Sequence, residues 1–206
     1  MAVSPNQYHL LTFDPGGTIG WAALAIDARA FSRPEHKVLP RITSFKFGEL
    51  HGTEIDQLAK ARELIYQACF GRMPYQPHLT NIVTEDFELT QRIGGANLLS
   101  PVRINAVLQW HCYTNGIVLQ FQKRSMRTGV TKERLIAWGL PKHRYRKDEF
   151  AAVQHAFTWI RRVKKDSIAH PWKLAHNGVM NAFWDCACDD GLPCDLVHPF
   201  HKPPRL

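Results

Sequence analysis

Near the start of the chain lies an apolar run that ends in a carboxylate and is followed by a turn with two glycines. Residues 8–14 have the pattern of a β-strand ending at Asp14. Pro15-Gly16-Gly17 then forces a tight reversal into a second apolar run at about residues 20–26. The sequence therefore predicts a β-hairpin with an acid at its mouth, and the remaining chain must supply a sheet and a core around it.

The segments that follow alternate between strand and helix patterns. Alternation over residues 42–48 predicts a third strand, and Thr53 with Asp56 forms a capping box at the start of a helix. Apolar spacing and turn residues place the later elements as follows: a helix at 54–70, a strand at 81–87, a helix between Leu98 and Tyr113, a strand at 117–122, a short helix at 131–138 and a helix at 147–162. We expect an α/β fold in which a mixed five-stranded sheet, three antiparallel strands and then two parallel ones, is flanked by helices.

The length, charge and cysteine content of the chain limit the classes of protein to which it can belong. With 206 residues the chain has room for one core, and we expect one domain over residues 1–163 followed by an irregular extension over 164–206. The 26 basic against 18 acidic residues give a net charge of +8, which suits a polyanionic partner such as nucleic acid. The first residues lack a secretory leader pattern and no apolar run is long enough for a membrane span, so we expect a cytoplasmic protein with reduced cysteines.

Three acids lie on predicted elements of the core, two near strand ends and one on a helix. Asp14 ends the first strand, Glu85 lies near the end of the strand at 81–87, and Asp148 lies on the last helix. His155 falls on the same helix face as Asp148, and the alanines between them would let this helix lie close to a sheet edge. Asp86 is an alternative to Glu85, but strand alternation puts only one of the two on the active face.

Each of these residues also has an ordinary structural explanation. Asp14 before Pro-Gly-Gly could be a turn residue, and Asp148 could favour the helix N-terminus through the helix dipole. Glu85 could face solvent, and His155 could be a hydrogen-bonded histidine of the core.

The order of elements and acids resembles the ribonuclease H-like superfamily, and within it the RuvC-type Holliday junction resolvases, particularly those of bacteriophages. The residues that carry the likeness are Phe13 to Ala22, Ile82 to Phe87, and Asp148 to Ala156. The resemblance implies that Asp14, Glu85 and Asp148 are metal-binding carboxylates with His155 nearby as a ligand, an orienting group for water or a proton donor. Family members carry two acids three residues apart on the last helix, or a histidine in place of one. Here Ala151 stands where the later acid belongs, or Tyr145 where the earlier one does, and Glu149 is the nearest substitute.

The resemblance also implies a chemistry and a substrate. Two divalent ions about 4 Å apart activate water and stabilise charge in phosphodiester hydrolysis, and Mg²⁺, or Mn²⁺, prefers carboxylate oxygens. The expected function is a Mg²⁺-dependent endodeoxyribonuclease acting on branched DNA such as four-way junctions, as a homodimer that cuts two opposed strands. The basic residues expected to grip phosphates are Lys123, Arg124, Arg127, Lys132, Arg146 and Lys147.

Other functions stay open at the level of the sequence. The motif around Asp14 also resembles the first phosphate loop of actin-like and sugar-kinase ATPases, although no second copy follows and the chain is short. A nuclease-like protein that binds nucleic acid without cleaving it is the other alternative. Near the C-terminal end, cysteines and histidines form no strong zinc spacing, and we expect incidental thiols rather than a zinc site at Cys186, Cys188, Cys194, His198 and His201.

Overall fold

A computed structural model of the chain describes residues 7–27, 42–70, 80–87, 99–138, 140 and 145–164. Five of its elements are strands, which form one mixed sheet in the order β3-β2-β1-β4-β5. The strands are β1 (Gln7–Asp14), β2 (Ile19–Asp27), β3 (Ile42–Leu50), β4 (Thr80–Asp86) and β5 (Leu119–Lys123). The helices are α1 (Glu54–Phe70), α2 (Leu99–Thr114), the 3-10 helix η6 (Arg124–Gly129), α3 (Lys132–Ala137) and α4 (Lys147–Lys164).

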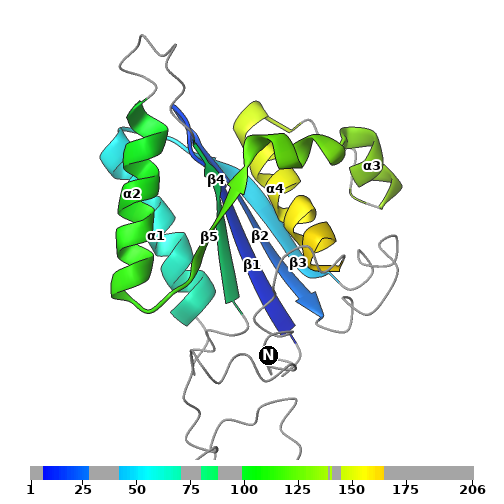
Figure 1. Cartoon of the computed structure of the whole chain (residues 1–206), viewed down its shortest axis with the longest axis horizontal. Helices are drawn as coiled ribbons and strands as arrows, with labels where there is room; N and C mark the ends of the chain where they lie inside the picture. Colours follow the sequence, from blue (N-terminus) through cyan, green and yellow to red (C-terminus); the bar gives the residue numbers. More distant parts are fainter. Residues whose placement is uncertain are drawn as a thin grey trace, which may run out of the picture.

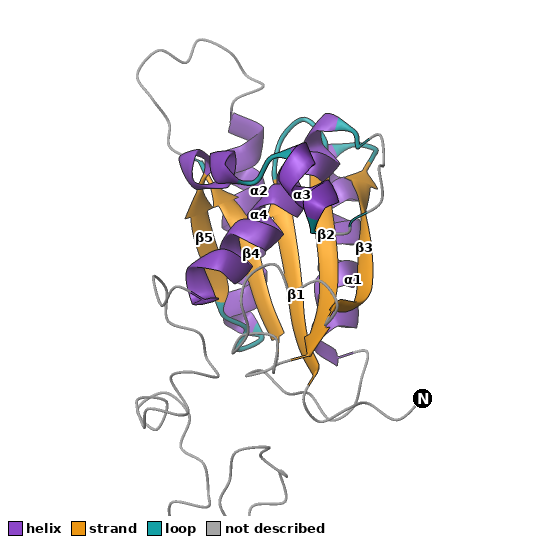
Figure 2. Cartoon of the chain, turned by 90° about the vertical axis from the view of Figure 1, so that its right-hand side faces the viewer, coloured by secondary structure: helices purple, strands orange, loops and turns teal. Residues whose placement is uncertain are grey.

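The sheet lies between two helical layers. Helices α1 and α2 cover one face, and α4 crosses the other, with α3 and η6 beside it (Figure 1). In the view turned by 90°, α4 lies in front of the strands and α1 behind them (Figure 2). β1 pairs antiparallel with β2 and parallel with β4, and β4 pairs parallel with β5. The carboxyl ends of β1, β4 and β5 therefore lie side by side along one edge of the sheet, the edge at which these strands end.

Strand β1 is buried on both faces, which explains its nearly continuous apolar sequence. Because side chains alternate along a strand, Tyr8 and Leu10 pack on the side of α4. Leu11 and Phe13 pack on the side of α1 and α2. The even-numbered positions of β1, which include Asp14, consequently face α4.

The structure confirms the predicted fold class. Helix α1 has the predicted bounds, and its capping box is formed by Thr53 and Asp56, whose side chains bond to each other and to the backbone N–H groups of this pair. The 3-10 helix after β5 was not predicted, and β5 begins at Leu119, two residues later than expected. Within the described part of the chain no helix is both long and apolar enough to cross a membrane. The C-terminal segment, with its cysteines and histidines at 186–201, lies outside the described residues.

Candidate metal centre

One row of residues crosses the sheet at the edge where β1, β4 and β5 end. Asp14 pairs with Gly20, and Gly20 pairs in turn with Glu49. On the other side Phe13 pairs with Thr84, which places Glu85 beside Asp14, and Glu85 pairs with a glutamine of β5. The row therefore reads Glu49, Gly20, Asp14, Glu85 and Gln122. Because paired residues point to the same face, all five face α4.

Helix α4 lies against this row at its one position without a side chain. A Cβ added to Gly20 would stand 2.0 Å from the carbonyl oxygen of Asp148, so only glycine allows the first turn of α4 to approach so closely. Further along the helix, the buried hydroxyl of Thr12 donates to the carbonyl of Ala152 at 2.8 Å. The expected close approach is present, but it is made over the face of the sheet at β1 and β2 rather than at a sheet edge.

The approach of α4 brings Asp14, Glu85 and His155 together. One ligand atom from each of these three buried residues lies within 4.8 Å of the others. His155 has no exposed surface, and its Nε2 is 2.9 Å from Oε2 of Glu85. The end of β1, the end of its parallel neighbour β4 and the distant helix α4 thus supply two carboxylates and an imidazole to one point.

Residues from the surrounding elements fix the positions of these ligands. Nδ1 of His155 lies 2.6 Å from Oε1 of Gln122. If a metal replaced the contact between Nε2 and Glu85, a proton on Nδ1 donated to this amide oxygen would leave Nε2 unprotonated and facing the carboxylates as a ligand atom. From the other helical layer, the side-chain amide of Asn105 donates to the carbonyl of Glu85 at 2.8 Å and accepts from the hydroxyl of Thr84.

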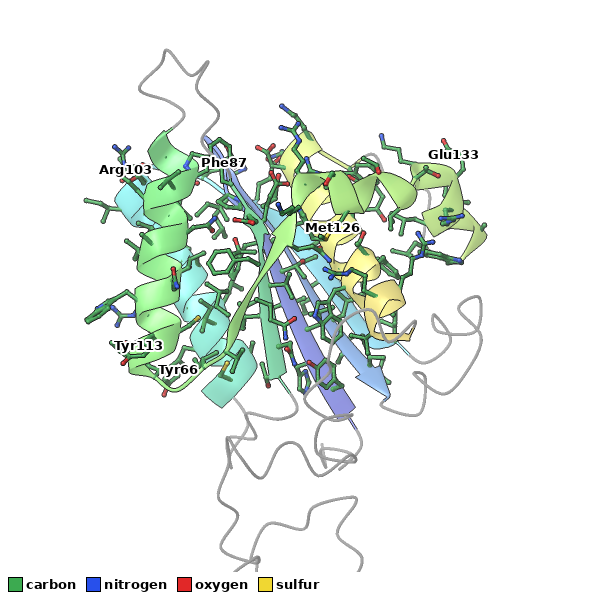
Figure 3. The ribbon with its side chains drawn as sticks, viewed as in Figure 1. Tyr66, Phe87, Arg103, Tyr113, Met126 and Glu133 are labelled. Atoms are coloured by element: carbon green, nitrogen blue, oxygen red, sulfur yellow. The ribbon has the colours of Figure 1, made fainter. Side chains whose placement is uncertain are left out.

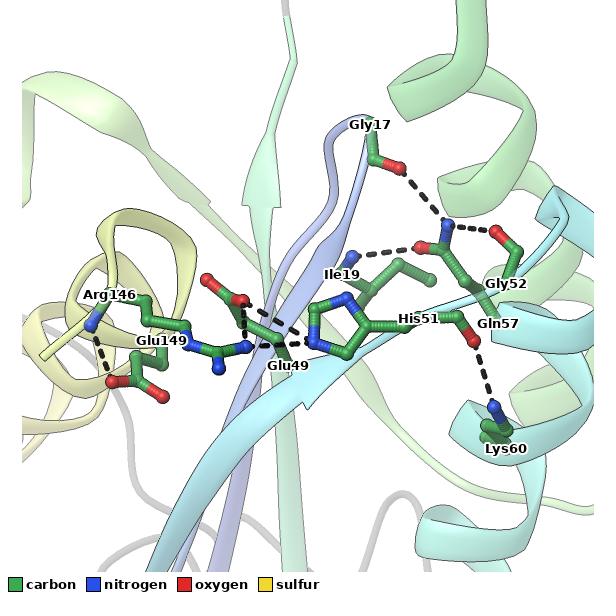
Figure 4. A network of polar contacts seen from close by, with 9 residues as sticks. All are labelled: Gly17, Ile19, Glu49, His51, Gly52, Gln57, Lys60, Arg146 and Glu149. Atoms are coloured by element: carbon green, nitrogen blue, oxygen red, sulfur yellow. Dashed lines mark hydrogen bonds and ion pairs between the residues drawn. The ribbon is translucent and has the colours of Figure 1, made fainter.

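The turn that follows Asp14 is held by Gln57 of α1, as Figure 4 shows. Its amide oxygen accepts from the backbone N–H of Ile19 at 2.8 Å, and its amide nitrogen donates to the carbonyls of Gly17 and Gly52 at 3.0 and 3.1 Å. Gln57 is buried. One side chain therefore joins the β1–β2 turn to the start of α1 and restricts the end of β1, where Asp14 lies.

Arg127, from η6, forms ion pairs with both carboxylates. Its Nη1 is 2.9 Å from Oδ1 of Asp14 and 2.9 Å from Oε2 of Glu85, and only 13% of its side chain is exposed. The sequence predicted a phosphate-gripping residue here. In this structure its guanidinium is paired with the acids of the site.

The two carboxyl groups differ in acidity. Burial raises the pKa of Asp14 to about 7, because desolvation and the nearby charge of Glu85 outweigh the attraction of Arg127. For Glu85, burial acts to raise the pKa, but the hydrogen bond from His155 and the charge of Arg127 lower it below its usual value. Burial also lowers the pKa of His155, which favours the neutral imidazole that a metal requires. Near pH 7 Asp14, rather than Glu85, is therefore the carboxyl group of this pair that holds a proton in part of the molecules.

Asp148 lies outside the three-residue cluster. It is half-buried in the first turn of α4, and its pKa is raised by burial and then by the charge of Glu49. Its charge also contributes to the raised pKa of Asp14, so it lies within electrostatic range of the cluster. Asp148, the ligand expected on the last helix, thus lies beside the row that runs from Glu49 to Gln122, on the side of β3.

Glu149, the expected substitute for the missing acid, caps the helix on which it lies. Its carboxylate accepts a hydrogen bond from the backbone N–H of Arg146, which caps the start of α4. The guanidinium of Arg146 pairs with Glu49 at 3.2 Å and contacts His51 at 3.0 Å (Figure 4). Asp86 is half-buried on the opposite face of β4 and does not join the cluster.

The remaining basic residues of the expected phosphate-binding set are exposed near the same edge. They are Lys123 at the end of β5, Arg124 in η6, Lys132 in α3 and Lys147 in α4. Lys132 also lies over the ring of Phe150, 5.3 Å from its centroid. Phe87 lies just past β4 at this end of the sheet, whereas Tyr66 and Tyr113 project at the opposite end (Figure 3). Exposed basic residues and the ring of Phe87 thus lie on elements at the end of the sheet that carries the acids.

Sequence reasoning did not single out Glu49, Gln57, Asn105 or Gln122. Strand alternation is a signal for Gln122, because Gln120 and Gln122 share one face of a strand expected to be buried. Glu49 follows the predicted third strand, and only its register with Gly20 reveals its place in the row. No local pattern marks Gln57 or Asn105, since each acts across a tertiary contact.

The donor set of the site fits a hard divalent cation. Carboxylate oxygens suit Mg²⁺ and Mn²⁺, and the neutral imidazole of His155 adds one nitrogen donor. The guanidinium nitrogen of Arg127, bonded to both acids, shows that a positive charge is already accommodated between them. Asp14, Glu85 and His155 are therefore the residues that would hold a metal ion.

This sheet order, with helices on both faces, is the ribonuclease H-like fold in the form found in RuvC resolvases. RuvC of Thermus thermophilus in complex with a Holliday junction substrate superposes with a TM-score of 0.55 and 10% identity, over 78% of this chain and 97% of the RuvC chain. A second structure of Thermus thermophilus RuvC has a TM-score of 0.49 and 13% identity, over 77% and 96%. Neither a protein-family description nor a curated protein matches the sequence.

Proposed function

We propose that the protein is a metal-dependent, structure-specific DNA endonuclease that hydrolyses phosphodiester bonds in branched DNA, as a Holliday junction resolvase does. The observation that carries this proposal is the convergence of Asp14, Glu85 and His155 on one point at the strand ends of a RuvC-like fold. One of the structures with this fold contains a Holliday junction substrate.

The residues have distinct parts in the proposed reaction. Divalent ions bound here would activate water and neutralise charge on the phosphate. Asp14, on the central strand, would hold its ligand oxygen in the most rigid position. Glu85 and His155 would complete the donor set, with the imidazole oriented by Gln122. Asp148 would act from the side of β3, where we propose that a second ion, with Mg²⁺ as the natural metal, is bound.

The exposed lysines and arginines near the site would bind the DNA backbone. Contacts of this kind recognise the path of the phosphates rather than the bases, which suits a substrate defined by its branching. Cutting two opposed strands of a junction requires two active sites, so we propose that the working form is a homodimer.

We further propose that residues 1–163 form the nuclease domain. The likeness of three segments, Phe13 to Ala22, Ile82 to Phe87 and Asp148 to Ala156, is the basis for proposing that the protein belongs to the bacteriophage branch of resolvases. Such a protein would act in the cytoplasm, where the DNA of a bacterium or an infecting phage lies.

Cleavage of defined DNA substrates tests the proposed function. Wild type and Asp14→Asn would be incubated with four-way junctions, flaps and linear duplexes in Mg²⁺ or Mn²⁺. We expect nicks near the branch point with wild type and none with the variant. Junction binding without cleavage would favour the nucleic-acid-binding alternative, and nucleotide hydrolysis without any effect on DNA would favour the ATPase alternative.

A further inference from the structure

The guanidinium of Arg127 occupies the place where a cation bound by Asp14 and Glu85 would stand. One nitrogen, Nη1, is 2.9 Å from an oxygen of each acid, and both acids are buried. Mg²⁺–oxygen distances in proteins are about 2.0–2.1 Å, so an ion held by Asp14 and Glu85 would need the space that Nη1 fills. An ion and this nitrogen cannot both lie between the two oxygens, so Arg127 and the metal compete for them.

The backbone that carries Arg127 is held independently of the carboxylates. The carbonyl of Gly129, two residues later, accepts hydrogen bonds from Arg161 at 3.0 Å and from Arg134. The next carbonyl, that of Val130, accepts one from Gln154 of α4. Because these contacts fix the end of η6, release of the guanidinium needs only rotation of the side chain, and the released group stays at the rim of the site.

We propose that Arg127 is a displaceable counter-ion, which holds the two carboxylates together without metal, is released by the incoming divalent cation, and then pairs with a phosphate of the substrate. The last step rests on the proposed nuclease function, whereas the competition with metal does not.

Phosphate is the natural next partner of the released group. A guanidinium presents paired N–H donors that match two oxygens of a phosphate, as they match a carboxylate. A divalent cation carries a higher charge than the guanidinium. When it binds the two carboxylates, Arg127 loses its anionic partners, and the site then holds the metal that hydrolysis requires. A DNA phosphate entering the site would restore an anion within its reach.

The competition is tested by metal binding alone. Mn²⁺ affinity would be measured by calorimetry at mildly alkaline pH, where carboxyl groups are ionised, for wild type, Arg127→Gln and Arg127→Lys. We expect Arg127→Gln to bind Mn²⁺ roughly tenfold more tightly, because no charge-assisted hydrogen bond must be broken first. Arg127→Lys, which keeps a competing cation, should stay within about threefold of wild type on the same argument.

Two further variants separate this effect from general electrostatics and from misfolding. Arg124→Gln removes the same charge from the same 3-10 helix, and its Mn²⁺ affinity should change less than that of Arg127→Gln. Arg127→Met keeps the apolar stem and provides a second neutral variant if glutamine disturbs the packing. Mn²⁺ affinity that is unchanged or weaker in a folded, neutral Arg127 variant would overturn the proposal.

The phosphate step has its own readout. At saturating Mn²⁺, Arg127→Gln should cleave a four-way junction at least about tenfold more slowly than wild type despite binding the metal more tightly, and Arg127→Lys should recover part of the rate. Equal cleavage rates would overturn the phosphate step. If wild type cleaves no DNA while the order of Mn²⁺ affinities is as expected, the proposed nuclease function fails and the assignment of Arg127 as a counter-ion stands.

Discussion

Replacing Gly20 by alanine would place a methyl group inside the contact between β2 and α4. The new Cβ would lie 2.0 Å from the carbonyl oxygen and 2.2 Å from the carbonyl carbon of Asp148, and 2.9 Å from the backbone nitrogen of Glu149. Ordinary contact begins at 3.4 Å, so the first turn of α4 would have to move by about 1.4 Å, the difference between 3.4 and 2.0 Å. All three atoms are backbone, and a rotamer change cannot relieve the clash.

The structure allows the cost of this movement to be estimated. Overpacking of a well-filled interior typically destabilises a protein by about 1–3 kcal/mol. The hydroxyl of Thr12 is bonded to the carbonyl of Ala152 in the same helix, so α4 cannot shift without straining that contact as well. We therefore expect Gly20→Ala to lower the free energy of unfolding by about 2 kcal/mol. Asp148 and His155 move with the helix, and a displacement near 1 Å commonly reduces activity about a hundredfold.

Gly17→Ala is the matched control for Gly20→Ala. Gly17 is exposed, and a Cβ added there meets no atom within 4 Å. Urea unfolding of both variants beside wild type measures the difference. We expect Gly17→Ala to be neutral or stabilising by up to about 1 kcal/mol. Equal stability of Gly20→Ala and wild type, with Mn²⁺ affinity unchanged, would show that α4 does not lie on the sheet as described.

Four further expectations follow from the bonds and charges of the site. Mn²⁺ affinity, followed by calorimetry against pH, should fall about tenfold per unit below pH 7, because the raised pKa of Asp14 leaves a proton that the metal must displace. In the metal-free protein the contribution of Asp14 to stability should be complete below about pH 4 and be lost as the pH rises through about 7; urea unfolding should show this loss in wild type but not in Asp14→Asn. Thr12→Val removes the bond to Ala152 and should cost about 1 kcal/mol in urea unfolding, with no cost meaning that this bond does not hold α4. Asn105→Ala leaves the carbonyl of Glu85 without its partner and should cost about 2 kcal/mol and weaken Mn²⁺ binding, whereas unchanged metal affinity would show that Glu85 is positioned without it.

Much of the fold could be predicted because the signals are local. The apolar run of β1 and the capping box at Thr53 depend on neighbouring residues alone, and both elements are present in the structure. The meeting of Asp14 and Glu85 was also predictable, because the ends of adjacent parallel strands lie at the same edge of a sheet.

The rest of the site depends on register and on contacts between layers. Glu49 joins the row only through the pairing of β3 with Gly20, which no local pattern determines. Arg127 faces the acids because a 3-10 helix, absent from the prediction, turns the chain back over the site. Gln57 and Asn105 reach the strand ends from the far helical layer, where the sequence indicates helix periodicity but not the partner of a polar side chain.

Cleavage of a four-way junction by wild type and Asp14→Asn tests the central claim most directly. The two proteins should be equally folded and bind the junction comparably, so that any difference reports chemistry at the metal centre. We expect Mn²⁺-dependent nicks near the branch point with wild type and none with Asp14→Asn. Nicking that persists at the wild-type rate in Asp14→Asn, or that needs no divalent metal, would contradict the account.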